Sequence, residues 1–224
     1  MYTNLDVCTV ALVSGAESVP PAGEGRFPHV AEVFSAADLP LTFSYAQALA
    51  GGLSRYGLYR LREAGTVEVL SRGLYRRTDG PPVDGGLVAV AVRAPAATVC
   101  LSSALARYGL SDAIPAATDV ALPRGTRRPA VAAAVNWHTF DPATFTLGRT
   151  RLDLDATTSI GLFTAERSII DAFRTRGTEG HELAYEALRR WLRRPGSHPS
   201  ELLSLAAHFP RVSVALRTAL EVLL

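Results

Sequence analysis

Hydrophobic and polar positions begin to alternate regularly only near Pro28. Residues 1–27, which include "SGAESVPPAGEGR", are rich in Gly, Pro, Ser and Glu, so we expect a flexible N-terminal extension there. In residues 28–78 the apolar spacing predicts short helices over 29–37, 42–50 and 54–64. The apolar run "TVEVLSRGLYRR" then predicts two strands joined by a turn. This is the element order of a winged helix-turn-helix.

A second unit follows the hairpin. The Pro, Gly and Asp content of the next segment predicts a linker over residues 79–86, and we assign residues 87–224 to a C-terminal domain. Within it, "TVCLSSALARYGL" predicts a helix, whereas "DVALPR", "AVAAAVNWHTF" and "TRLDLDA" predict strands. The period of "LVAVAVRAP" fits either a helix or a strand. Helices are predicted at about 164–175, 179–194, 199–208 and 212–223. The predicted class is α+β, with a mixed α/β C-terminal domain that ends in several helices.

The helix predicted within "GGLSRYGLYRLREAG", residues 51–65, has an unusual outer face. At 100° per residue, Leu58 and Leu61 face the core, together with Gly57 and Ala64. Two tyrosines, three arginines and one acid, Glu63, occupy the rest. Arginine can bind phosphate oxygens or a guanine edge, and tyrosine can donate to phosphate or pack on sugars and thymine methyls. A solvated amphipathic helix is the simpler alternative, but the glycine turn before it and the basic hairpin after it favour DNA. The predicted DNA contacts are Ser54, Arg55, Tyr56, Tyr59, Arg60, Arg62, Arg72, Arg76 and Arg77.

Charge is unevenly distributed along the chain. The formal net charge is +2, and all 23 basic residues are arginine. Residues 1–40 are acidic, and the basic excess is densest in residues 41–80, which suits a phosphate backbone. The absence of lysine excludes phosphate loops of the Walker type, Schiff-base catalysis and serine–lysine sites.

Cysteine content and hydropathy indicate the compartment. Cys8 and Cys100 are the only cysteines, which argues against a disulfide framework. The N-terminal apolar patch has no basic residue before it, which argues against a secretory signal. No apolar run reaches the ~18 residues that would cross a bilayer. We therefore expect a cytoplasmic protein without membrane partners.

The residue types that enzymes use for catalysis are present, but they do not form the complete pattern of a catalytic or metal site. Asp153 and Asp155 have the strand spacing used for Mg²⁺ in nucleotidyltransferases, but the Gly-Ser helix start expected before them is missing. Surface strand acids explain this pair better. The five histidines have no metal-ligand spacing, and the serines at 102 and 103 lack the glycines of a nucleophile elbow. We predict no enzyme activity, no metal and no cofactor.

Two arginine clusters lie outside the predicted DNA-binding domain. One is "LRRWLRRPG", residues 188–196, where a packed Trp with arginines at a helix end is the simpler interpretation. The other is "PRGTRRP", residues 123–129, a Gly/Pro loop that can expose its arginines. Both also fit a second surface for DNA or an acidic partner. The residues concerned are Arg124, Arg127, Arg128, Arg189, Arg190, Arg193 and Arg194.

The segment "TFSYAQALAGGLSRYGLYRLREAGTVEVLSRGLYRR" resembles the N-terminal winged helix of AbiEi-family antitoxins of bacterial abortive-infection toxin–antitoxin systems. "LSSALARYGLSDAIPAATDVALPRGTRRP" and "FTAERSIIDAFRTRG" resemble the C-terminal region of the same family. Together the resemblance covers about residues 28–224. It implies a type IV antitoxin, a transcriptional repressor that binds inverted repeats in front of its own operon, with two copies on the DNA. The C-terminal domain would neutralise a nucleotidyltransferase-like toxin, with or without direct contact.

Three other functions remain open from the sequence. A stand-alone winged-helix regulator predicts the same DNA contacts and has no toxin. A nucleotidyltransferase relative would use Asp153 and Asp155 and would lose activity in Asp155→Ala. A pure protein-interaction module would show no salt-dependent DNA binding.

Overall fold

The computed structural model describes residues 36–179 and 181–224, and these belong to one compact unit. The predicted extension, residues 1–27, lies outside the described residues. So does most of the first predicted helix, 29–37, of which only residues 36 and 37 are described, in a 3₁₀ turn. No helix in the described part of the chain is long and apolar enough to cross a membrane.

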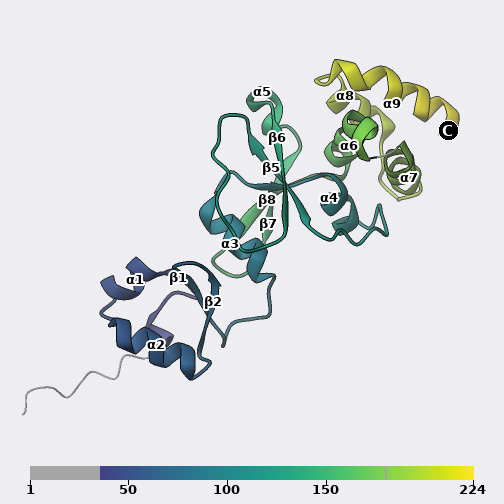
Figure 1. The fold of residues 1–224 in the computed structure, drawn as a ribbon. Coiled ribbons are helices and arrows are strands. Elements are labelled where there is room, and N and C mark those ends of the chain that lie inside the picture. The colour runs from purple at the N-terminus through teal and green to yellow at the C-terminus, as the bar shows by residue number, and fades with distance from the viewer. Residues whose placement is uncertain (1–35, 180) are drawn as a thin grey trace, which may run out of the picture. The chain divides into compact units, whose positions relative to one another are not determined.

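The first part of the described chain combines two short helices with a three-stranded antiparallel sheet (Figure 1). Its elements are η1 (Ala36–Asp38), β1 (Thr42–Ser44), α1 (Tyr45–Ala50), α2 (Arg55–Glu63), β2 (Val67–Ser71) and β3 (Leu74–Arg77). The strand order is β1-β3-β2, so that β3 of the predicted hairpin is central. The helix, helix and hairpin order predicted from the sequence is present. Strand β1 was not predicted.

Side-chain caps explain where the two helices begin. Ser44 starts α1 with a capping box, in which its Oγ accepts the Gln47 N–H and the Gln47 Oε1 accepts the Ser44 N–H. Ser54 starts α2 by accepting the Gly57 N–H at 3.0 Å. The chain leaves α2 through Gly65, whose φ of +70° is favourable only for glycine. The start of α2 and its end before Gly65 were both predicted correctly.

The second part of the described chain is built on a five-stranded mixed sheet with strand order β6-β5-β4-β8-β7. Its strands are β4 (Thr98–Val99), β5 (Thr118–Pro123), β6 (Val135–Phe140), β7 (Arg149–Asp153) and β8 (Ser159–Phe163). Apolar side chains of α3 (Gly85–Arg93) and of α4 (Leu101–Arg107) pack with this sheet in one core cluster. "LVAVAVRAP" is therefore a helix, and it begins inside the segment predicted as a linker. β8 and the short α5 (Pro142–Phe145) were not predicted, and neither was β4, whose two residues begin the segment predicted as a helix.

Four helices end the chain, close to the predicted ranges (Figure 1). They are α6 (Ala165–Glu179), α7 (His181–Leu192), α8 (Pro199–Ala206) and α9 (Pro210–Leu223). Their apolar faces form a shared core that includes Ile169, Leu188, Trp191 and Leu216. The Trp191 indole N–H donates to Glu166 at 3.0 Å, so this buried ring has its polar atom satisfied.

Candidate nucleic-acid interface

The outer face of α2 is exposed as the pattern predicted. Tyr56 is 69% exposed and Tyr59 is 53% exposed, whereas Leu58 on the opposite face is only 4% exposed. These two aromatic side chains lie three residues apart on the water side of one short helix, and neighbouring exposed apolar groups of this kind mark interaction surfaces. The three arginines of this face are also exposed, at positions 55, 60 and 62.

A tight turn connects α1 to α2. Gly52 has a φ of +93°, and the N–H of Leu53 reaches back to the carbonyl of Ala48 at 3.0 Å. Leu53 is itself buried, 4% exposed, and so fixes the turn to the core. Ser54, predicted to contact DNA, has a structural role, since its hydroxyl oxygen caps α2.

The hairpin turn holds Arg72 on the surface. Arg72 is exposed, and Arg93 of α3 bonds both the Arg72 carbonyl and the side chain of Ser71 before it. The Arg93 Nε donates to the Ser71 Oγ at 3.1 Å, and its Nη2 donates to the Arg72 carbonyl. Sequence reasoning missed Arg93, because nothing in its local pattern places it beside a turn some twenty residues earlier.

Two of the predicted DNA contacts need correction. The Arg76 side chain is only 2% exposed, and its guanidinium bonds Asp155 at 2.6 Å, Thr42 Oγ1 at 3.2 Å and the Pro81 carbonyl at 3.0 Å. A buried arginine whose guanidinium is already bonded to three groups of the protein is not accessible to DNA, so Arg76 is a structural residue. The prediction failed because alternation in a short strand does not say which face is covered.

The Arg77 guanidinium is also mostly bonded to other groups of the protein. Its side chain is 18% exposed and pairs with Asp79. Its Nη1 also donates to the carbonyls of Ala37 and Leu39, at 3.0 and 2.9 Å. These bonds tie the end of β3 to the segment before β1, which leaves little of Arg77 for a ligand.

Asp155 is not the surface strand acid that we expected. It follows β7, and its side chain has no exposed area, whereas Asp153 is 65% exposed and pairs with Arg151 at 2.5 Å. Burial raises the pKa of Asp155, but hydrogen bonds from Thr157, Arg76 and Thr158 outweigh burial and lower the pKa to about 2. A carboxylate committed to an arginine and two threonines is poorly placed to bind Mg²⁺.

The arginines of the predicted second surface fall into two groups. Arg190 pairs with Asp112 and Glu186, and Arg194 donates to the Tyr108 carbonyl, so these two brace α7 against the loop after α4. Arg128 is exposed and donates to Thr139 at 3.4 Å. The remaining members of the set are exposed: Arg124, Arg127, Arg189 and Arg193. The cluster at residues 188–196 is therefore partly structural, and the loop at 123–129 is the freer one.

A polar cluster of side chains from α4, β5 and β6 was also not predicted from the sequence. Asp119, 5% exposed, accepts hydrogen bonds from Ser102, Asn136 and His138, the last at 3.0 Å. Burial raises the pKa of Asp119, but these bonds outweigh it and lower the pKa. The cluster holds α4 to the sheet. Among the described residues, no group of three or more His, Cys, Asp or Glu side chains could hold a metal ion.

Comparison with known proteins supports a regulator. Residues 33–78 match a family model described as a transcriptional regulator, AbiEi antitoxin. This match confirms the predicted resemblance for less than a quarter of the chain. Among solved structures, the crystal structure of the RV2827C protein from Mycobacterium tuberculosis is 18% identical and has a TM-score of 0.48, with coverage of 80% of this chain and 76% of that one. A likeness at this level carries no functional argument. No match was found among curated proteins.

Proposed function

Because residues 33–78 match the AbiEi antitoxin regulators, we propose that this chain is a cytoplasmic DNA-binding antitoxin and an autorepressor of its own toxin–antitoxin operon. In this proposal, residues 36–78 act as a winged helix-turn-helix, with α2 as the recognition helix and the β2–β3 hairpin as the wing. The observation that carries it is the exposed tyrosine and arginine face of α2 within the matched segment.

The geometry of α2 supports the role of a major-groove helix. Its first turn begins at Ser54, so Arg55 and Tyr56 stand at the helix start, the end that reads bases in helix-turn-helix proteins. Tyr59 lies one turn further along, with Arg60 and Arg62 beside it at the helix end. The guanidinium groups can bind guanine edges or phosphates, and the tyrosines can donate to phosphates or pack on sugars and thymine methyls.

The hairpin supports the role of a wing. Arg72 lies in the turn between β2 and β3, exposed, while Arg93 holds the backbone of that turn. An arginine presented at a hairpin tip suits the narrow minor groove or its flanking phosphates. Arg76 and Arg77 have no part in this contact, because the fold itself occupies their guanidinium groups.

A gel-shift assay with the DNA upstream of the operon tests the proposal. The double variant Arg55→Ala/Tyr59→Ala should abolish the shift, since it removes a charged and an aromatic contact from the centre of the interface. Both side chains are exposed, so the melting temperature should stay within a few degrees of the wild type. Arg217→Ala, at an exposed arginine of α9, is the matched control and should bind normally. An unchanged shift in the double variant would contradict the recognition-helix assignment.

The antitoxin half of the proposal concerns a second gene product. We expect the neighbouring reading frame to encode a nucleotidyltransferase-like toxin whose growth inhibition is relieved by co-expression of this chain. A pull-down with both partners folded tests direct contact. If co-expression gives no relief while DNA binding persists, the chain is a stand-alone winged-helix regulator. The buried ion pair of Asp155 weighs against the nucleotidyltransferase alternative for this chain.

A further inference from the structure

A cavity of about 620 Å³ lies in the C-terminal part of the chain, outside the proposed DNA-binding segment. Its walls come from the ends of β5 and β6, from α5 and α6, and from the start of α9. Arg124 follows β5, Arg174 stands on α6, and Arg211 is in the first turn of α9. Three arginines from separate parts of the chain therefore line one concave site.

Acidic groups do not balance these arginines. Asp141 is the one carboxylate among the lining residues described for this cavity, and its Oδ1 already accepts the Ala143 N–H at the start of α5. Behind the wall, Asp171 accepts from Arg174 at 3.0 Å and from Arg167 at 2.9 Å. Four guanidinium groups thus face two carboxylates, which leaves a formal excess of two positive charges before His208, also in the lining, is considered.

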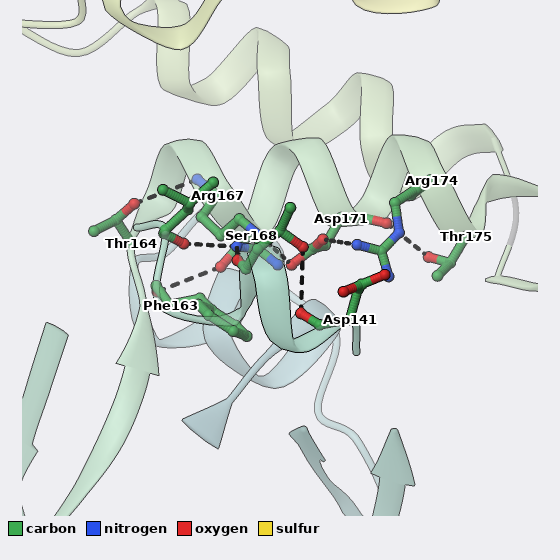
Figure 2. A network of polar contacts seen from close by, with 10 residues as sticks. Asp141, Phe163, Thr164, Arg167, Ser168, Asp171, Arg174 and Thr175 are labelled. Atoms are coloured by element: carbon green, nitrogen blue, oxygen red, sulfur yellow. Dashed lines mark hydrogen bonds and ion pairs between the residues drawn. The ribbon is translucent and has the colours of Figure 1, made fainter. Parts of the chain in front are cut away.

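The network behind the cavity fixes the position of Arg174 (Figure 2). Arg167 is fully buried between the rings of Phe163 and Phe209, with its Cζ 4.4 and 4.5 Å from their centroids. It holds Asp171, and Asp171 in turn holds Arg174, whose side chain is still 30% exposed. Arg174 is therefore a preorganised cation at the cavity wall, and its side chain is only partly covered by the protein.

The other two arginines are available to a ligand. Arg124 and Arg211 are both exposed, and neither forms an ion pair with an acid in the described part of the chain. Arginine binds phosphate oxygens through two parallel N–H donors, and several arginines around one concavity match a group with several anionic oxygens. The N-terminus of α9, at Pro210 in the same lining, adds partial positive charge on that side.

We infer that this cavity binds a small phosphate ester of nucleotide size, with its phosphate groups on Arg124, Arg174 and Arg211. The volume is far larger than a free phosphate ion needs and lies in the range of small-ligand pockets, so an organic moiety fits beside the phosphates. Concavity favours a small ligand over a DNA backbone, which approaches proteins along open surfaces. The assignment is independent of DNA binding through α2.

Calorimetric titration of the full chain with ATP tests the inference, at constant ionic strength because exposed charges are screened by salt. ATP should bind saturably with one site per chain, inorganic phosphate should compete, and adenosine should not bind. The variant Arg124→Gln/Arg211→Gln should weaken ATP binding at least tenfold. Both residues are exposed and unpaired in the described chain, so the variant should keep the melting temperature of the wild type.

Arg127→Gln is the matched control, since Arg127 is an exposed arginine of the same loop that does not line the cavity. It should leave ATP binding within twofold. The inference is overturned if ATP shows no saturable binding, or if Arg127→Gln weakens binding as much as the double variant. It is also overturned if a DNA duplex, and not ATP, depends on Arg124 and Arg211. Gel shifts of the α2 variants are unaffected by any of these results, so the two proposals fail separately.

Discussion

Arg72 and Arg76 belong to one hairpin and have opposite environments. Arg76 is sealed against Asp155, whereas Arg72 stands at the turn with its side chain in water. An exposed arginine at a wing contacts phosphates and the minor groove more than it reads individual bases. The proposed function therefore assigns Arg72 an electrostatic contribution to DNA binding that is largely independent of sequence.

Substitution of Arg72 should accordingly weaken binding evenly. Arg72→Ala should lower the affinity for operator and unrelated duplexes by similar factors, and should reduce the slope of log K against log salt by about 1. Fluorescence anisotropy over a salt series measures both quantities. Arg107→Ala, at an exposed arginine of α4, serves as the control. A loss confined to the operator sequence would show that Arg72 reads bases instead.

Asp155 gives the fold a defined dependence on pH. Its pKa of about 2 in the folded chain lies below the value of about 3.9 in an unfolded one, so its ionised form stabilises the fold above about pH 4. This contribution, about 2 kcal/mol, should disappear as the pH falls towards 2. In urea unfolding from pH 5 to 2, the advantage of the wild type over Asp155→Asn should shrink by that amount. Asp153→Asn, at an exposed carboxylate, should show no comparable change.

At the scale of elements, the stability of α2 depends on the residue that caps its start, Ser54. The Ser54 hydroxyl satisfies the Gly57 N–H, which otherwise has no partner within the helix. Ser54→Ala should lower the free energy of unfolding by about 1 kcal/mol and should weaken DNA binding only through fraying of the first turn. Ser204→Ala, inside α8, is the control and should be nearly neutral. Loss of DNA binding with unchanged stability would instead make Ser54 a direct contact.

Elements whose ends are fixed by local hydrogen bonds could be predicted from the sequence, whereas elements that depend on long-range contacts could not. Ser54 and Gly65 bound α2 through bonds to residues a few positions away, so their roles follow from the adjacent sequence. β1 has three residues, too few for a period, and it exists because Thr42 and Ser44 pair with β3 about thirty residues later. "LVAVAVRAP" became a helix because α3 lies against the core with several successive residues buried, a pattern that periodicity cannot assign.

In the candidate site, too, features set by local geometry were predictable from the sequence, and features set by distant contacts were not. The exposure of Tyr56 and Tyr59 could be predicted because helical geometry alone separates them from Leu58. The burial of Arg76 could not, since its partner Asp155 is 79 positions away in the sequence. The cavity lined by Arg124 and Arg211 depends on several elements meeting, from the end of β5 to the start of α9, which only the tertiary structure shows.

At the scale of the whole molecule, contacts join the proposed wing to the C-terminal part of the chain. Arg93 of α3 holds the hairpin turn, and Asp155 after β7 receives Arg76 of β3. The described residues accordingly form one compact unit. A hairpin whose turn is already held by contacts from other elements loses less conformational entropy when it binds DNA. This favours higher affinity.

One copy of this chain offers a small surface for the proposed base reading, so the proposed specific repression requires two copies. The exposed face of α2 has only Arg55, Tyr56 and Tyr59 near the helix start for base edges, and each good base contact gives about 1–3 kcal/mol of discrimination. We expect two chains on an inverted repeat, and at least tenfold weaker binding to a duplex with one half-site. Sedimentation with labelled duplexes measures both. Insertion of about five base pairs between half-sites rotates them to opposite faces and should abolish any cooperativity between the chains. One chain per repeat, bound as tightly as to a half-site, would contradict this arrangement.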